Sequence, residues 1–303
     1  GNLMKVDILM ATYNGEKYIS QQIESIINQS YEDWTLRIRD DASTDGTMVI
    51  VRQYARKYPE KIKFFENREN SGSPKANFFS LIKDSDADVI FCCDQDDIWE
   101  SDKIEITLKE FENINKPLLV HSDLRVIDEN NNIVCKSMIK RQHINVKRTA
   151  LNQLIVQNVV TGCTMAINRQ LADIIVEPEL LTVHDWWIAV TASIFGIIKF
   201  INKPTIKYRK HNNNACGPQN MSSPKYIAKR AINKPKAKKM LDYGYVMAVE
   251  LLEKYKIPYE YKPMLKAYGA MGNKNKFNKL KTVFKYNTWK SGVIRKLGQI
   301  WFM

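Results

Sequence analysis

The 303-residue chain has no long hydrophobic run. Its longest uncharged, apolar-leaning stretch, residues 186–198, is about a dozen residues long, whereas a membrane-spanning helix needs roughly 20. No secretory signal pattern stands at its start. The sequence also lacks G-x-G-x-x-G and G-x-x-x-x-G-K-[ST], so the dinucleotide-binding and P-loop classes have no anchor here. We therefore expect a soluble protein outside those two classes.

Cysteine is scarce and unpaired in pattern. The five cysteines are Cys92, Cys93, Cys135, Cys163 and Cys216. Their number is odd, none forms a C-x-x-C pair, and two adjoin within an apolar run. This pattern argues against a disulfide framework and a zinc site, and it fits a reducing cytosol.

Acidic residues are scarce in the last third of the chain. Residues 203–303 hold 23 Lys and Arg against 4 Asp and Glu, a net charge of +19. The first 202 residues hold 23 basic and 29 acidic groups, a net charge of −6. A slightly acidic body thus carries a strongly basic tail, which predicts an anionic partner such as a membrane, a nucleic acid or phosphates.

Short strands alternate with helices in the first third of the chain. The hydrophobic periodicity predicts strands at 6–10, 34–39, 62–65 and 88–93, and helices at 19–27, 50–58, 77–82 and 104–114, the last capped by Ser101. This alternation is typical of parallel βαβ units in a doubly wound sheet. Further strands are expected at 118–122, 197–201 and 206–209, before basic helices with interleaved aromatic residues.

Polar clusters follow three of these strands, at the strand ends where ligands bind in such sheets. The cluster 94–97 (Asp-Gln-Asp-Asp) crowds three carboxylates, which repel one another unless a cation lies between them. The alternative is a solvated acidic turn that caps the next helix. A second cluster, Asp40-Asp41, offers carboxylates for a base or a ribose, although Ser43 and Asp45 also predict a helix cap.

Five segments in order resemble family 2 glycosyltransferases of the GT-A fold. They are Ala-Thr-Tyr-Asn-Gly (11–15), Arg-Asp-Asp-Ala-Ser-Thr-Asp-Gly-Thr (39–47), Cys-Asp-Gln-Asp-Asp-Ile-Trp (93–99), His-Asp-Trp-Trp (184–187) and Tyr-Arg-Lys-His-Asn-Asn-Asn (208–214). The resemblance implies an α/β fold with a Rossmann-like mixed sheet flanked by helices. It also implies a catalytic domain over residues 1–217, with a nucleotide-sugar half to about 117 and an acceptor half from 118. Residues 218–303 would form a basic helical appendage.

The resemblance implies a donor site for a dTDP- or UDP-sugar. Asp41 would hold the base with Asp40 nearby, and Lys75 would lie near the diphosphate. The remaining donor contacts would come from Thr12, Tyr13, Asn14, Asp94 and Gln95.

It further implies an inverting, metal-dependent hexosyltransferase. Asp96 and His211 would ligate Mn²⁺ or Mg²⁺, which offsets the charge of the leaving diphosphate. Asp185 would be the general base that takes the proton of the acceptor hydroxyl. Acceptor or sugar contacts would come from Thr161, Gly162, Trp186 and Trp187, although core packing is the plainer role for at least one tryptophan.

Processive polymerases of the family carry a Q-x-x-R-W motif and membrane spans, and this sequence has neither. The motif set looks most like bacterial members that transfer rhamnose from dTDP-rhamnose in capsule, O-antigen or cell-wall polysaccharides. UDP-hexose donors stay open. A nucleotidyltransferase, or a non-enzymatic basic module that binds membrane or nucleic acid, are the competing interpretations.

Residues 225–303 interleave Lys with Tyr, Phe and Trp. Basic helices with aromatic anchors favour an anionic membrane surface. A saccharide acceptor attached to a polyprenyl diphosphate would place the enzyme in the cytoplasm, peripheral on the inner face of the cell membrane. The alternative is a solvated charged face on a small helical element. No recognised nucleic-acid-binding motif occurs, so no nucleic-acid partner is expected.

Overall fold

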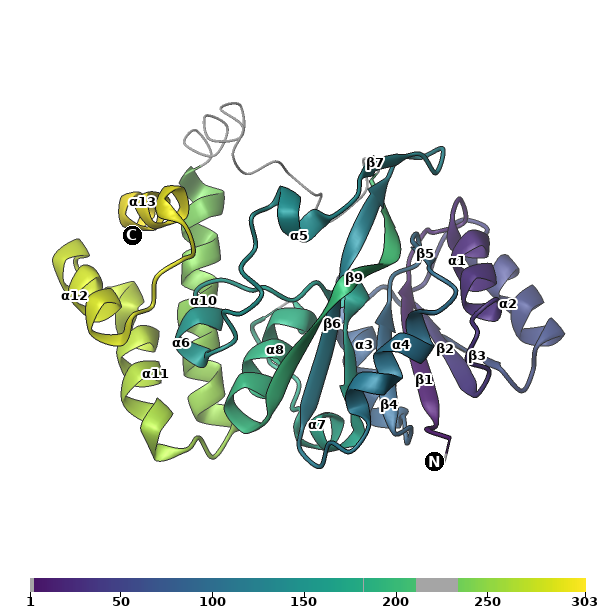
Figure 1. The fold of residues 1–303 in the computed structure, drawn as a ribbon, viewed down its shortest axis with the longest axis horizontal. Coiled ribbons are helices and arrows are strands. Elements are labelled where there is room, and N and C mark those ends of the chain that lie inside the picture. The colour runs from purple at the N-terminus through teal and green to yellow at the C-terminus, as the bar shows by residue number, and fades with distance from the viewer. Residues whose placement is uncertain (1–2, 182, 211–233) are drawn as a thin grey trace. The chain divides into compact units, whose positions relative to one another are not determined.

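The computed structural model describes residues 3–181, 183–210 and 234–303 (Figure 1). The chain divides into two compact units, which we term the sheet unit and the helical unit. The sheet unit comprises Gly1–Met138, Val160–Ile175 and Gly196–Pro218, and the helical unit comprises Ile139–Val159, Val176–Phe195 and Gln219–Met303. A compact unit need not be a functional domain, so the expected division at residue 217 stays a prediction.

The sheet unit begins with the predicted alternation of strands and helices. Its first elements are β1 (Val6–Thr12), α1 (Ile19–Ile27), β2 (Trp34–Asp40), α2 (Thr47–Lys57), β3 (Ile62–Glu66), α3 (Pro74–Asp84) and β4 (Val89–Cys93). These four strands pair in parallel in the order β3-β2-β1-β4. Their carboxyl ends therefore meet at one edge of the sheet, as the sequence predicts.

Beyond β4 the sheet is mixed rather than uniformly parallel. The later elements are β5 (Ile98–Trp99), α4 (Lys103–Leu108), η1 (Lys109–Phe111), β6 (Leu118–Ile127), β7 (Ile133–Cys135), η2 (Gly162–Thr164), β8 (Ala166–Asn168), α7 (Arg169–Ile174) and β9 (Ile197–Arg209). Strand β8 runs antiparallel between β4 and β6, and β9 pairs in parallel with β6 and antiparallel with β5. The two strands expected at 197–201 and 206–209 are one long strand. Helix α4 begins after Asp102, not after Ser101, and Asp102 makes no side-chain cap.

Both faces of the sheet are covered by apolar residues. One core packs α1, α2 and α4 on alternate residues of the strands, such as Ile8, Leu36 and Phe91, all fully buried. On the other face α3 contacts β1 and β2, and α7 contacts β4 and β8. A sheet covered in this way positions its edge loops rigidly.

The helical unit contains α5 (Met138–Arg141), which begins at the unit boundary, and α6 (Leu151–Leu154), α8 (His184–Phe195), α10 (Lys234–Lys254), η3 (Tyr259–Tyr261), α11 (Lys262–Gly269), η4 (Ala270–Asn273), α12 (Lys276–Tyr286) and α13 (Val293–Phe302). Helix α10 contacts both α11 and α13. Among the described helices, none has the length and apolar character needed to cross a bilayer.

Strand β6 carries a buried histidine that the predicted chemistry does not use. His121 is 1% exposed, and its ring lies 5.0 Å from that of Phe200. In the described part of the chain neither ring nitrogen has a hydrogen-bond partner. Burial lowers the pKa of His121 to about 4, so the ring is neutral in the folded protein near pH 7.

We expect the free energy of unfolding to fall less between pH 7 and pH 5 in His121→Leu than in the wild type. In the unfolded chain the histidine takes up a proton below about pH 6.5, whereas in the folded protein it does so only near pH 4. The folded state is therefore penalised as the pH falls through this window, by about 2 kcal/mol at pH 5. Urea unfolding at pH 7 and pH 5 should show a drop smaller by that amount in the variant.

His143→Asn is the matched control. His143 is exposed, and its φ of 49° is one that asparagine also adopts. The control should keep the wild-type pH dependence. Equal pH dependence in all three proteins would contradict the role assigned to His121.

Candidate donor and cation site

The loops that follow β1 and β2 are joined by hydrogen bonds. Thr12 donates its hydroxyl to Asp40 Oδ2 (2.7 Å), and Asp40 also accepts from the amide and hydroxyl of Ser43 (2.8 and 2.6 Å). The Asn14 side-chain oxygen accepts from the backbone amide of Thr44 (2.8 Å), and the backbone amide of Asn14 donates to Ser43 Oγ (2.9 Å). Thr12, Asn14 and Asp40, all predicted donor contacts, thus hold the nucleotide-side loops in shape.

Asp41 follows Asp40 in the loop after β2, and its side chain is 5% exposed. It accepts hydrogen bonds of 2.9 Å from Asn67 Nδ2 and from the amide and hydroxyl of Ser71. Burial alone would raise the pKa of Asp41, but these hydrogen bonds outweigh burial and lower it. Asp41 is therefore a charged acceptor at the carboxyl edge of the sheet, the property needed to receive the N–H of a base.

Tyr13 and Lys75 complete the predicted donor set. Tyr13 is 48% exposed, whereas its backbone is tightly held. Lys75 is half-buried in the first turn of α3, where Ser73 accepts its backbone amide (3.2 Å) as the helix cap. Tyr13 follows β1, and Lys75 lies in the helix that follows β3, so both come after strand ends at the same edge of the sheet.

The Gln95 side chain is bound to the backbone of Tyr13. Its Oε1 accepts from Tyr13 N and its Nε2 donates to Tyr13 O, both at 2.9 Å. An amide paired in this way reproduces one rung of a β-ladder between the β1 and β4 loops. Gly15 leaves the room for it, because a Cβ there would lie 2.4 Å from Gln95 Oε1.

We expect Gly15→Ala to act by displacing Gln95. Either Gly15→Ala or Gln95→Ala should lower the free energy of unfolding by about 1–2 kcal/mol, the cost of two lost hydrogen bonds at a partly exposed site. If the mechanism is right, the double variant should lose little more than one single variant in urea unfolding. Fully additive losses would contradict it.

The acidic loop that follows β4 is held at each end. Gln22, fully buried on α1, donates to the carbonyl of Asp94 (2.8 Å). Arg209, fully buried at the end of β9, donates from Nε to the carbonyl of Asp96 (3.0 Å) and from its backbone amide to Asp97 Oδ1 (3.1 Å). Residues of α1 and β9 thus hold the loop at both ends.

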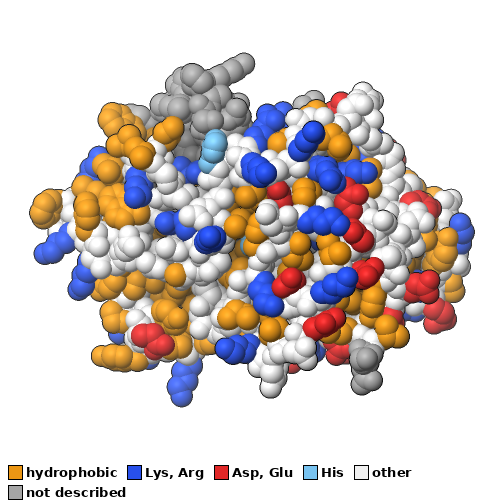
Figure 2. All heavy atoms as spheres, viewed as in Figure 1, with side chains coloured by type: hydrophobic (Ala, Val, Ile, Leu, Met, Phe, Trp, Pro, Cys, Tyr) orange, Lys and Arg blue, Asp and Glu red, His pale blue; other side chains and the backbone are white. Residues whose placement is uncertain are grey.

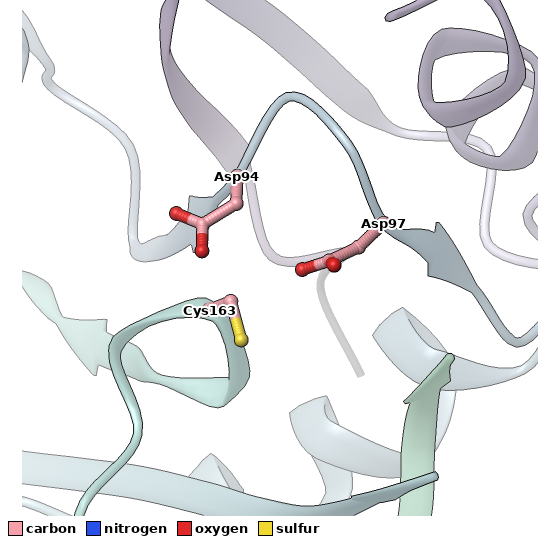
Figure 3. Close-up of side chains that lie close together, drawn as sticks. All are labelled: Asp94, Asp97 and Cys163. Atoms are coloured by element: carbon pink, nitrogen blue, oxygen red, sulfur yellow. The ribbon is translucent and has the colours of Figure 1, made fainter. Parts of the chain in front are cut away.

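Asp94, Asp97 and Cys163 converge within this loop region. Their ligand atoms all lie within 4.8 Å of one another. Figure 3 shows the two carboxylates projecting from one loop toward the cysteine, which lies in the turn η2 between Gly162 and Thr164, just after Thr161. Asp97 is fully buried, and among the described residues its Oδ2 has no hydrogen-bond partner.

This arrangement favours a bound cation. Burial, together with the charges of Asp96 and Asp94, raises the pKa of Asp97 well above its usual range. A divalent cation would offset that repulsion and satisfy the unpaired oxygen. Hard divalent ions prefer oxygen ligands, so the carboxylates fit Mg²⁺ or Mn²⁺ and Cys163 would line the site.

The predicted ligands differ in part from this group. Asp96 is half-buried and is not one of the three converging side chains in the described structure. His211 lies outside the described residues. The ligand roles of Asp96 and His211 therefore stay predictions, and Asp94 and Asp97 join them as candidate ligands.

Sequence reasoning missed a buried cation near this loop. Lys103 is fully buried, its Nζ donates to Thr205 Oγ1 (3.2 Å), and it lies over the rings of Trp99 (4.9 Å) and Phe91 (5.6 Å). Burial lowers the pKa of Lys103 to about 8, and the pull of nearby groups such as Asp97 only partly offsets this. The spacing of four residues between Trp99 and Lys103 can be read from the sequence, but it does not indicate that Lys103 is buried.

The predicted acceptor residues of the helical unit lie at the start of α8. Asp185 is half-buried in the first turn, and one of its oxygens accepts from the amide of Trp186 (2.6 Å). Trp186 and Trp187 are 4% and 0% exposed. Their indole N–H groups donate to the carbonyls of Leu154 and Val176, both at 2.7 Å. Both rings are core residues of this unit, and a sugar contact by either one stays a prediction.

Comparison with known proteins gives a consistent picture. Residues 7–175 match the model of the family described as glycosyl transferase family 2. The chain is 31% identical to the dTDP-rhamnosyl transferase RfbG of Shigella flexneri over 233 residues, which are 72% of this chain and 76% of the relative. It is 28% identical over 167 residues to WfgD of Escherichia coli, a UDP-Glc:alpha-D-GlcNAc-diphosphoundecaprenol beta-1,3-glucosyltransferase, covering 55% of this chain and 61% of that one.

Solved structures with the same fold are more distant in sequence. TarS 1–349 of S. aureus in complex with UDP-GlcNAc has a TM-score of 0.60 at 19% identity, with 93% of this chain and 80% of that chain covered. The mannosyltransferase PcManGT of Pyrobaculum calidifontis, in complex with GDP-Man and Mn²⁺, has a TM-score of 0.58 at 18% identity, with coverages of 99% and 83%. These similarities establish the GT-A fold, with a mixed sheet flanked by helices.

Proposed function

The chain belongs to glycosyl transferase family 2, and on that basis we propose that it transfers rhamnose from dTDP-rhamnose to a saccharide acceptor. We place this transfer in bacterial polysaccharide synthesis. The observation that carries the proposal is the fixed carboxylate group of Asp94 and Asp97 beside the locked β1 and β2 loops. The choice of rhamnose is supported by the similarity to a dTDP-rhamnosyl transferase. A UDP-hexose donor is the alternative.

The proposed donor site divides the nucleotide-sugar between two groups of residues. Asp41 accepts the N–H of the base and the exposed Tyr13 ring lies against it, while Lys75 neutralises part of the diphosphate charge. Asp94, Asp96, Asp97 and His211 would hold Mn²⁺ or Mg²⁺. When bound, such an ion stabilises the negative charge that develops on the leaving diphosphate.

The proposed transfer is a single displacement that inverts the anomeric carbon. The acceptor oxygen forms a bond to that carbon as the bond to the diphosphate breaks, and Asp185 takes the hydroxyl proton. Asp185 is offered for this role because it is a half-buried carboxylate in the first turn of α8.

We further propose a lipid-linked acceptor. WfgD, by its name, acts on a diphosphoundecaprenol-linked sugar. A polyprenyl-diphosphate-linked saccharide here would require the enzyme to work in the cytoplasm, peripheral on the inner face of the membrane. The basic helices of residues 234–303 support that position.

Donor turnover tests the proposal. Purified protein is incubated with Mn²⁺ or Mg²⁺ and with dTDP-rhamnose, UDP-glucose, UDP-galactose or UDP-N-acetylglucosamine, and release of the nucleoside diphosphate is measured. We expect release from dTDP-rhamnose that EDTA abolishes and Asp97→Asn reduces at least about tenfold. Release only from a UDP-sugar would make that sugar nucleotide the donor in place of dTDP-rhamnose. No release from any donor, with no thermal shift by dTDP or UDP, would overturn the donor site.

A further inference from the structure

The apolar side of α13 faces solvent. Val293, Ile294, Leu297 and Trp301 are 73%, 52%, 61% and 65% exposed. At the helical repeat these four residues fall within roughly 100° of the helix circumference. They form one continuous stripe rather than scattered exposed residues, and a stripe of this kind calls for a partner.

The opposite side of α13 is polar and faces the helical unit. Gln299 is 2% exposed, accepts from the amide of Lys290 (2.8 Å) and donates to the carbonyl of Thr288 (2.8 Å). Arg295 donates to the carbonyls of Gln142 and His143. A helix on the surface of a globular protein normally buries its apolar side. In helix α13 the polar side instead faces the protein, and hydrogen bonds hold it there.

Helix α12 adds aromatic side chains and is joined to α13. Phe277 and Phe284 are 76% and 70% exposed, and the ring of Phe284 meets that of Trp289 edge-on at 5.0 Å. Lys279 Nζ donates to the carbonyl of Met303, just after α13 (3.2 Å). Figure 2 shows hydrophobic side chains gathered over α13 and the adjoining end of α12, with Lys and Arg side chains among them.

The charge of this surface selects the partner. Residues 262–303 contain ten Lys and Arg and no Asp or Glu. Exposed lysines on the two helices are Lys276, Lys281, Lys285 and Lys296. A second copy of the chain would bring the same positive charge against it, and a nucleic acid would leave the apolar stripe in water. An anionic bilayer satisfies both features, through its acyl boundary and its headgroups.

We propose that the α12–α13 surface binds in the interfacial plane of an anionic lipid bilayer. The stripe from Val293 to Trp301, with Phe277 and Phe284, enters the boundary between headgroups and acyl chains, and the lysines pair with lipid phosphates. This deepens the peripheral position proposed above, and it does not depend on the identity of the donor sugar.

Vesicle flotation of the full chain tests this proposal. The vesicles contain phosphatidylcholine alone, or phosphatidylcholine with roughly a third phosphatidylglycerol. We expect binding to the anionic vesicles, reduced at least about tenfold by Leu297→Ser with Trp301→Ser because two anchors are lost. Lys281→Glu with Lys285→Glu should also reduce binding, and its difference from the wild type should shrink as salt is raised, because salt screens the exposed charges. Tyr259→Ser, a change at an 83% exposed aromatic residue outside α12 and α13, is the matched control and should bind like the wild type.

Two outcomes would overturn the proposal. One is equal binding of the wild type and the Leu297/Trp301 variant, or no binding by either. The other is a dimer in light scattering that the same variant converts to monomer, which would make a second copy the occupant. All substituted side chains are exposed, so thermal unfolding should be unchanged. Donor turnover measured without vesicles should also be unchanged, which separates failure here from failure of the proposed transfer.

Discussion

Replacing Arg209 by Met is expected to lower the free energy of unfolding by about 3–5 kcal/mol. The guanidinium is fully buried and lies 4.3 Å from the ring of Tyr18. It donates to acceptors contributed by α1, the acidic loop and the turn after β6, namely Gln21 Oε1, Asp96 O, Asp128 O and Asn131 Oδ1. Methionine fills much of the volume but leaves these buried acceptors without donors.

Urea unfolding measures this effect, and Arg209→Lys refines it. Lysine keeps the charge but lacks the planar fork that reaches several acceptors at once, so it should recover only part of the loss. Arg125→Met is the control, because Arg125 pairs with Glu100 at a site where the two side chains are 33% and 25% exposed. Its cost should stay near or below about 1 kcal/mol. Comparable losses for the two arginines would refute the structural role of Arg209.

Replacing Asp185 by Asn is expected to lower the rate of sugar transfer by about 10²–10⁴-fold without changing stability or donor binding. Asparagine keeps the shape and can still accept from the amide of Trp186, but it cannot take up the acceptor proton. The measurement is transfer to acceptor under saturating donor, together with the thermal shift produced by nucleotide and metal. Asp97→Asn should differ from Asp185→Asn, because it should reduce the metal-dependent thermal shift as well as turnover.

Asp173→Asn serves as the control for Asp185. Asp173 is a mostly exposed helical carboxylate that pairs with Arg169 on α7. Its replacement should leave transfer unchanged. Transfer by Asp185→Asn within a few-fold of the wild type would remove Asp185 from the mechanism and leave the proton to another base.

The first four strands were predictable because their signals are local. Each strand is a short apolar run that ends in turn residues, and each following helix shows a clear apolar stripe. The placement of β8 between β4 and β6 was not predictable, because Ala166–Asn168 is only three residues long and its pairing is decided by partners far along the chain. The start of α4 was missed by one residue because Ser101 and Asp102 are both ordinary cap residues.

The candidate site was predictable to the level of motifs and no further. The acidic loop and the Asp40–Asp41 pair stood out by composition, but which carboxylate is buried depends on tertiary contacts. Asp97 is fully buried, and it accepts a hydrogen bond from the backbone amide of Arg209, more than a hundred residues later. Gln95 and Asp40 belong to the motifs as predicted, yet in the structure their hydrogen bonds go to the protein itself. No local pattern distinguishes a side chain that binds a ligand from one that holds the loop which does.

The pairing of Gln95 with Tyr13 has a consequence for how relatives with this fold diverge. The backbone at position 13 is anchored through both its N–H and its C=O, and neither bond involves the tyrosine ring. The side chain there is therefore free to change without cost to the loop, while the carboxylates across the ladder stay where they are. In the proposed donor site, where the Tyr13 ring lies against the base, a substitution at this exposed position would change the base contact and leave the proposed cation site unchanged.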